Sequence, residues 1–213
     1  MVKKNLKSLN SKKLIIFDLD GVIINSKESM SLAWSSVRRE LKSKISFKKY
    51  FDCIGLPFFQ ILKKIEFDKD YDKAHFIYNK TAIDNQNKIK LYPGAKKIIN
   101  DLYKKKITCL VTSKSKIRTK KILKKFNLKF NYIFCPEDIR PFKPDPNIII
   151  KLKKKLKLNR SDIIYIGDTF IDSKFAKKGR IDYFHASYGY GTKNKNDNDI
   201  KSLKDLHFQI LNS

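Results

Sequence analysis

Short apolar runs of strand length recur along the chain. Each is followed by a polar or small-residue turn and then by a segment whose apolar residues have helical spacing. The runs are Leu14–Leu19, Ile107–Thr112, Tyr132–Cys135, Ile163–Gly167 and Ile181–His185. This alternation predicts an α/β fold with a parallel sheet flanked by helices. Because the runs are continuously apolar, we expect strands that are covered on both faces.

The segment between residues 25 and 90 has a different pattern, with amphipathic segments and no strand-like run. The apolar positions that we assign to three helical faces are Leu32, Val37 and Leu41; Phe58, Ile61, Leu62 and Ile65; and Phe76, Ile77 and Ile83. The sequence "YPGAKK" at 92–97 then supplies a turn and a new helix start. We therefore predict a Rossmann-like core domain at 1–24 and 91–213, with a helical cap domain at 25–90 inserted after the first strand.

The net charge of +27 raises the question of nucleic-acid binding, since basic surfaces displace counterions from a phosphate backbone. Nearly all of this charge is lysine, scattered along presumed helices, whereas nucleic-acid readers rely on arginine forks and interleaved aromatic residues. We therefore expect no nucleic-acid partner and interpret the lysine excess as a solvated surface.

The N-terminal segment is basic, but only four apolar residues precede Asp18, too few for a signal peptide or a membrane span. We expect a cytoplasmic protein with no membrane partner. The three cysteines are Cys53, Cys109 and Cys135; they are odd in number and widely spaced, with no CxxC pair. Reduced and mostly buried thiols are expected, rather than disulfides or a zinc site.

Polar residues that suit phosphate chemistry follow the predicted strands. They are Asp18 and Asp20 after the first strand, Thr112 and Ser113 after the second, Lys143 in the loop "FKPDP", and Asp168 and Asp172 in "IGDTFIDS". In open parallel sheets, ligands bind beyond the carboxyl ends of the strands. We therefore expect these side chains to meet at one edge of the sheet.

Several acids at one strand end repel one another unless a cation neutralises them. Mg²⁺ is the simplest choice, because it takes carboxylate, carbonyl and water ligands and bridges to phosphate. The hydroxyl of Thr112, the backbone N–H groups around Ser113 and the ammonium of Lys143 would bind the other oxygens of a phosphate. One carboxylate then remains to attack phosphorus and form an aspartyl phosphate.

The segments "DLDGV", "TSKS", "KPDP" and "GDTFID" occur in this order and at suitable separations. In these four motifs, the chain resembles the haloacid dehalogenase (HAD) superfamily, and in particular its small-molecule phosphatases with a helical cap, such as phosphoglycolate phosphatases. The loop "YGYGT" at 188–192 is also similar to one found in phosphoglycolate phosphatases.

The resemblance implies a role for each acid. Asp18 would be the nucleophile and a metal ligand. Asp20 would act as general acid and then as general base, with its backbone carbonyl on the metal. Asp168 would be the second carboxylate on Mg²⁺, and Asp172 would support it from behind or through water.

The resemblance also implies which residues hold the phosphoryl group. Thr112 and Lys143 would bind it, and Lys143 would shield Asp18 from the incoming dianion. Ser113 departs from the asparagine that relatives often carry, so its backbone N–H is the expected contact.

The function predicted is Mg²⁺-dependent hydrolysis of a small phosphate monoester, phosphoglycolate or a sugar phosphate. One alternative is a sugar phosphomutase of the β-phosphoglucomutase kind, which "DLDGVI" and Trp34 resemble. Met30, however, stands where those enzymes carry a histidine, and "IGLPFFQIL" lacks their cap arginine. The alternative from another class is a nucleic-acid or polyanion-binding protein on a degenerate phosphatase fold, against which the complete set of acids argues. The oligomeric state is left open.

Overall fold

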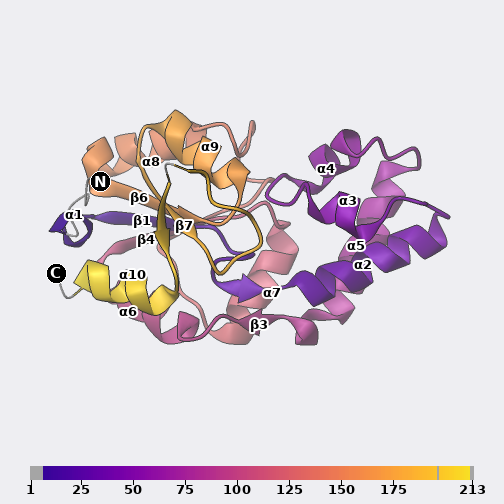
Figure 1. Cartoon of the computed structure of the whole chain (residues 1–213), viewed down its shortest axis with the longest axis horizontal. Helices are drawn as coiled ribbons and strands as arrows, with labels where there is room; N and C mark the ends of the chain where they lie inside the picture. Colours follow the sequence, from indigo (N-terminus) through magenta and orange to yellow (C-terminus); the bar gives the residue numbers. More distant parts are fainter. Residues whose placement is uncertain (1–6, 196, 212–213) are drawn as a thin grey trace.

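Six parallel strands form the central sheet of the structure, a computed structural model that describes residues 7–195 and 197–211 (Figure 1). The sheet order is β5-β4-β1-β6-β7-β8. The strands are β1 Leu14–Phe17, β4 Ile107–Val111, β5 Tyr132–Phe134, β6 Ile163–Gly167, β7 Asp182–Ala186 and β8 Asn198–Ile200. The central strand β1 pairs with β4 on one side and β6 on the other, and its four residues are all buried.

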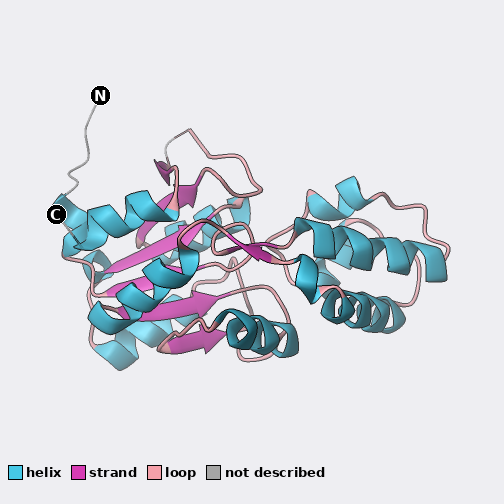
Figure 2. Ribbon diagram, turned by 90° about the horizontal axis from the view of Figure 1, so that it is seen from below, coloured by secondary structure: helices cyan, strands magenta, loops and turns pink. Residues whose placement is uncertain are grey.

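Helices cover both faces of this sheet, as Figures 1 and 2 show. On one face lie α6 Ala95–Lys105, α7 Lys116–Phe126 and α10 Leu203–Leu211; on the other lie α8 Asn147–Leu156 and α9 Phe170–Gly179. Ile15 and Phe17 of β1 belong to the first core, whereas Leu14 and Ile16 belong to the second. Successive side chains of a strand point to opposite faces, so one apolar run supplies both cores. The short elements are α1 Lys7–Asn10 and the 3₁₀ turns η1 Gln86–Lys88 and η2 Arg160–Asp162.

The inserted segment forms a separate helical layer beside the sheet (Figure 2). Its helices are α2 Lys27–Glu40, α3 Phe47–Phe51, α4 Phe58–Lys64 and α5 Tyr71–Asp84. They enclose their own core around Trp34, whose ring stacks on Tyr50 with centroids 4.5 Å apart. The two chain connections to the sheet lie side by side as antiparallel β2 Ile24–Asn25 and β3 Lys90–Leu91.

The predicted α/β fold is confirmed, and all five predicted strands occur with ends displaced by at most two residues. Strands β8, β2 and β3 were not predicted. The first reads "NDI" and the other two have two residues each, so none presents an apolar run. The division at 1–24, 25–90 and 91–213 stays a prediction, and the pairing of β2 with β3 beside its two boundaries supports it.

Two of the predicted helical faces were wrong in part. Leu32 is 38% exposed and Phe76 is 67% exposed, because α2 and α5 turn other residues inward. The buried residues of these two helices include Ala33, Trp34 and Val37 on α2, and Ala74, Ile77 and Tyr78 on α5. The three cysteines are free, with Cys109 and Cys135 buried, as expected. Within the described residues, no helix is both long enough and apolar enough to span a membrane.

Candidate active site

Three of the predicted site residues follow neighbouring strands at one edge of the sheet. Asp18 follows β1, Thr112 follows β4 and Asp168 follows β6. These strands are adjacent and parallel, so their carboxyl ends bring the three residues together. The Asp18 N–H donates to the Ile166 carbonyl at 2.9 Å, which extends the strand pairing into the site.

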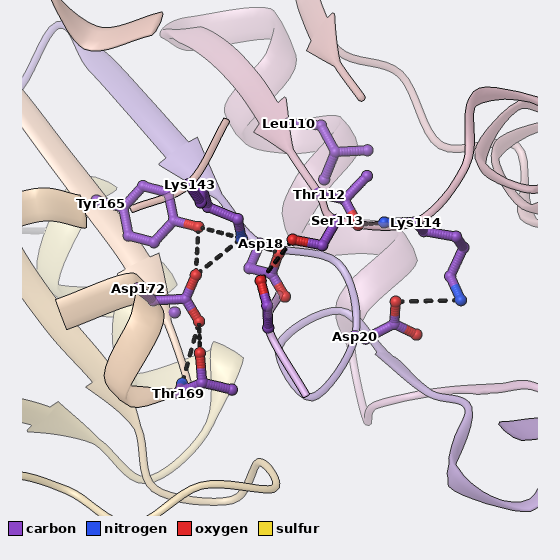
Figure 3. Close-up of polar contacts among 12 residues, drawn as sticks. Asp18, Asp20, Leu110, Thr112, Ser113, Lys114, Lys143, Tyr165, Thr169 and Asp172 are labelled. Atoms are coloured by element: carbon purple, nitrogen blue, oxygen red, sulfur yellow. Dashed lines mark hydrogen bonds and ion pairs between the residues drawn. The ribbon is translucent and has the colours of Figure 1, made fainter. Parts of the chain in front are cut away.

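Lys143 lies in the loop between β5 and α8, and its side chain is fully buried. Its ammonium donates to Asp18 Oδ1 at 2.7 Å, Asp172 Oδ1 at 2.8 Å and the Tyr165 hydroxyl oxygen at 3.1 Å (Figure 3). Burial alone lowers the pKa of Lys143, but the two carboxylates outweigh burial and hold the pKa above its ordinary value. Lys143 therefore carries a fixed positive charge behind Asp18.

Asp172 connects this charge to the start of α9. Its Oδ2 accepts from the Thr169 backbone N–H at 3.0 Å and from the Thr169 hydroxyl at 2.6 Å, a capping box that begins the helix. Its Oδ1 accepts from Lys143 and from the Tyr165 hydroxyl at 2.7 Å. Burial raises the pKa of Asp172, yet Lys143 and these hydrogen bonds hold it below the usual value. Asp172 is therefore ionised and has all its acceptor positions engaged.

Within the part of the chain that the structure describes, Asp168 has no ion pair and fewer hydrogen bonds than Asp172 to stabilise its ionised form. Its Oδ2 accepts from the Tyr190 N–H at 2.7 Å, but Oδ1 is buried and has no hydrogen-bond partner among the described residues. Burial, Asp172 and Asp18 together raise the pKa of Asp168 well above its usual value. The pKa of Asp18 is also raised, to about 7, because burial and the neighbouring carboxylates outweigh the opposing effect of Lys143.

These acids fit a hard divalent cation. Asp18, Asp168 and Asp172 offer oxygens that all lie within 4.8 Å of one another. Asp172 is already saturated by hydrogen bonds, which leaves Asp18 and the unpartnered Asp168 Oδ1 to coordinate the ion. Gly21 has φ +82°, and a Cβ there would lie 1.9 Å from Asp168 Oδ2, so only glycine allows this close approach.

Asp20 lies on the side of Asp18 opposite Lys143 (Figure 3). Its Oδ2 is 3.1 Å from the Lys114 ammonium, and its Oδ1 accepts from the Ser26 hydroxyl. The side chain is therefore held by Lys114, in the loop before α7, and by Ser26. The metal contact predicted for its backbone carbonyl stays a prediction.

Thr112 and Ser113, which follow β4, make different contacts. Thr112 is buried, and its Oγ1 accepts from the Lys114 backbone N–H at 3.2 Å. The Ser113 hydroxyl donates to the Gly55 carbonyl of the inserted segment at 2.5 Å. The Ser113 side chain thus links the two parts of the chain, which leaves its backbone N–H as the candidate phosphate contact.

A cavity of about 150 Å³ lies between this edge of the sheet and the helical layer. Asp18, Asp20, Thr112 and Lys114 line it from the sheet side. The inserted segment contributes an apolar and aromatic surface that includes Met30, Tyr50, Ile54, Leu56, Phe58, Phe59 and Tyr78. The cavity therefore joins the predicted acids to a surface that excludes water.

Three residues of this site were not predicted from the sequence: Lys114, Tyr165 and Arg118. Lys114 stands inside the quoted segment "TSKS", but it is one of many lysines, and only its burial beside Asp20 distinguishes it. Burial and the neighbouring Arg118 lower the pKa of Lys114 to about 8, against the opposing effect of Asp20. Tyr165 lies within β6, where an aromatic residue indicates only a strand, and Arg118 carries no sequence signal that we recognise.

A comparison with protein-family models matches residues 15–186 to the haloacid dehalogenase-like hydrolases. Among curated proteins, the chain is 26% identical over 187 residues to the phosphoglycolate phosphatase of Aquifex aeolicus, covering 84% of this chain and 86% of that protein. It is 23% identical over 203 residues to the pyrophosphatase PpaX of Halalkalibacterium halodurans, covering 90% of this chain and 94% of that protein.

Solved structures show the same fold. A haloacid dehalogenase-like family hydrolase from Streptococcus pneumoniae superimposes with a TM-score of 0.78 at 20% identity, covering 93% of this chain and 98% of that chain. The similarity extends over both the sheet and the inserted helices.

Proposed function

This chain belongs to the haloacid dehalogenase-like hydrolase family, and on that premise we propose that it hydrolyses a small phosphate monoester with Mg²⁺ as cofactor. Phosphoglycolate and sugar phosphates are the proposed substrates, and Asp18 is the proposed nucleophile. One observation carries the proposal: Asp18 lies on the cavity with a buried ammonium 2.7 Å behind it and an unpartnered carboxylate oxygen of Asp168 in the same group of acids.

In the first step, a carboxylate oxygen of Asp18 forms a bond to phosphorus while the bond to the ester oxygen breaks. Asp20 donates a proton to the departing oxygen, which leaves as an alcohol. The Thr112 hydroxyl and the Ser113 backbone N–H bind phosphoryl oxygens, and the Lys143 ammonium offsets the charge that builds up beside Asp18.

In the second step, Asp20 takes a proton from water, and the water oxygen attacks the phosphorus of the aspartyl phosphate. Inorganic phosphate leaves, and Asp18 is regenerated as a carboxylate. Asp18 and Asp168 would hold Mg²⁺, with Asp172 oriented behind them by Lys143 and Thr169. The bound ion supplies positive charge that lets adjacent acids ionise and that neutralises phosphoryl oxygens.

The first test is a panel of phosphate esters assayed with the wild type and Asp18→Asn, with Mg²⁺ present and after chelation. Asp18→Asn should keep its circular dichroism spectrum and lose turnover by at least about 10⁴-fold. The matched control is Asp84→Asn, an exposed acid at the end of α5, which should retain wild-type turnover. Acid quenching with labelled substrate should trap covalent phosphate on the wild type and none on Asp18→Asn. Near-normal turnover in Asp18→Asn would overturn the nucleophile assignment.

The second test measures the ion without catalysis. Mg²⁺ should raise the melting temperature of the wild type, because binding to the folded state alone stabilises it. Asp168→Asn should lose this response, since its Oδ1 is the unpartnered oxygen. An equal Mg²⁺-induced shift in both proteins would remove Asp168 from the proposed ligand set. Sugar-phosphate isomerisation, assayed in parallel, tests the mutase alternative.

A further inference from the structure

Arg118 lies in the first turn of α7 and is only 8% exposed, yet it forms no ion pair with any residue in 7–195 or 197–211. Its guanidinium carbon is 5.1 Å from the centroid of the Tyr78 ring. Arg118 also lines the cavity described above. A buried cation without a counter-charge is unfavourable, so a guanidinium held this way is ready to accept an anion from the cavity.

The acids nearest to Arg118 are engaged elsewhere. Asp20 pairs with Lys114 at 3.1 Å and accepts from Ser26. Glu137 is exposed, and its Oε1 accepts from the backbone N–H of Lys116 at 2.9 Å. The other ionisable or amide side chains that line the cavity are Asp18, which pairs with Lys143, and Tyr50, His75, Tyr78, Asn79, Lys114 and Arg140. Lys114 thus has its counter-charge in Asp20, whereas Arg118 has no acid within ion-pair distance among the described residues.

The proposed function already assigns the phosphoryl group to Thr112, Ser113 and Lys143, which leaves Arg118 available for the leaving group. Thr112, Lys114 and Arg118 follow one another from the end of β4 into α7. Lys114 contacts Asp20, the proposed donor of the proton to the departing oxygen. Arg118 lines the same cavity as Asp18 and Asp20, so a leaving group held in this cavity can contact it. The cavity volume of about 150 Å³, close to that which holds benzene in an engineered protein, is enough for a leaving group of a few heavy atoms.

We propose that Arg118 selects substrates whose leaving group carries a second anionic group close to the scissile oxygen, either a carboxylate or a second phosphoryl group. This inference rests on the proposed function and assigns Arg118 as a residue that determines specificity. A guanidinium forms paired hydrogen bonds to both kinds of anion. A neutral leaving group would leave the cation buried and unpaired, which is how polar sites reject analogues that lack the matching group.

The test compares kcat/KM for four phosphate compounds. In 2-phosphoglycolate and inorganic pyrophosphate the leaving group is anionic; in 2-phosphoglycolamide and ethyl phosphate, called the neutral esters here, the leaving group is uncharged. The wild type should prefer 2-phosphoglycolate or pyrophosphate over the neutral esters by at least tenfold, and the preferred member of the pair identifies the anion. Arg118→Met should abolish this preference by raising KM for the anionic substrate, with the neutral esters unchanged within threefold. Arg118→Lys should retain part of the preference, because it keeps the positive charge but loses the paired N–H donors of the guanidinium. Arg38→Met, an exposed arginine on α2, is the matched control and should keep the wild-type ratios.

Melting temperatures separate this role from a structural one. Arg118→Met should melt no lower than the wild type, because it removes an unpaired buried charge, whereas loss of a structural arginine would lower the melting temperature. If esters are hydrolysed with no preference for a second anion, or if Arg118→Met keeps the preference, the inference is wrong and the proposed function stands. If no ester is hydrolysed at all, the proposed function fails and this inference fails with it.

Discussion

The two sides of the cavity are built from different interactions. The core wall consists of Asp18 with Lys143 and Asp172 behind it, joined by ion pairs of 2.7 and 2.8 Å. The cap wall consists of Tyr50, Phe58 and Tyr78, which touch through aromatic rings with centroids 4.9 to 6.3 Å apart. Charged hydrogen bonds fix position and direction, whereas aromatic contacts mainly exclude water and tolerate adjustment. For the proposed function, the difference teaches that the core wall is suited to fixing reacting groups and the cap wall to adjusting around a substrate.

The largest effect is expected from Lys143→Met, which breaks the core wall. It leaves Asp18 and Asp172 buried without their shared cation, and breaking such a buried pair costs about 3–5 kcal/mol of unfolding free energy. Turnover should be lost for every substrate. Urea unfolding in the presence of a chelator measures the stability, and Lys96→Met, an exposed lysine on α6, should change it by less than about 0.5 kcal/mol. Wild-type stability in Lys143→Met would show that the core wall is not held by this charge.

Asp20→Asn should have the next largest effect, and turnover is where we expect it. Loss of a general acid typically lowers kcat by about 10²–10⁴-fold. The reduction should be large for alkyl phosphates and smaller for p-nitrophenyl phosphate, because its phenolate leaves without protonation. Steady-state kinetics on the two esters measure the contrast. Equal losses on both esters would assign Asp20 to a role other than proton donation.

Phe58→Ala tests the cap wall. Removing this ring opens the apolar surface, and KM should rise by about tenfold, equivalent to about 1.4 kcal/mol, with kcat little changed. Phe76→Ala provides the comparison on the outer side of α5, where the ring is 67% exposed and no change is expected. A fall in kcat as large as that of Asp20→Asn would contradict the division of tasks between the walls.

Ser113→Ala should have the smallest effect, since it removes one contact between the walls. The hydrogen bond from its hydroxyl to the Gly55 carbonyl, 2.5 Å long, is worth about 0.5–1.5 kcal/mol. KM should therefore rise by no more than about tenfold, again with kcat retained. Ser187→Ala, which removes a surface hydrogen bond to Asp199, should leave both constants unchanged. A large loss of kcat in Ser113→Ala would show that its hydroxyl acts on the phosphoryl group.

The core wall was accessible from the sequence, because Asp18 directly follows a strand-like run, Lys143 stands beside a proline in a loop, and Asp172 lies in the motif "GDTFID" that follows another such run. Strand ends meet at one sheet edge whatever the details of packing, so order along the chain was enough to place them. The sequence did not show which carboxylate oxygens remain free to bind the metal. Asp172 was expected to support the metal, and only its hydrogen bonds to Lys143, Tyr165 and Thr169 show why it is saturated.

The cap wall was much less accessible. Helical periodicity identified α2, α4 and α5, but it did not fix their rotation, so Leu32 and Phe76 were assigned to buried faces that they do not occupy. A short helix with many apolar residues offers several nearly equivalent faces, and tertiary contacts choose among them. Arg118 shows the same limit, because nothing near it in sequence distinguishes a buried guanidinium from a solvated one.

The pairing of β2 with β3 holds the two chain connections of the inserted helices together at one joint, since Ile24 lies opposite Leu91 and Asn25 opposite Lys90. A segment spliced in at such a joint can grow, shrink or be replaced without shifting the register of the sheet. For the proposed function, exchange of this one contiguous segment would change the range of substrates and leave the residues at the edge of the sheet unchanged.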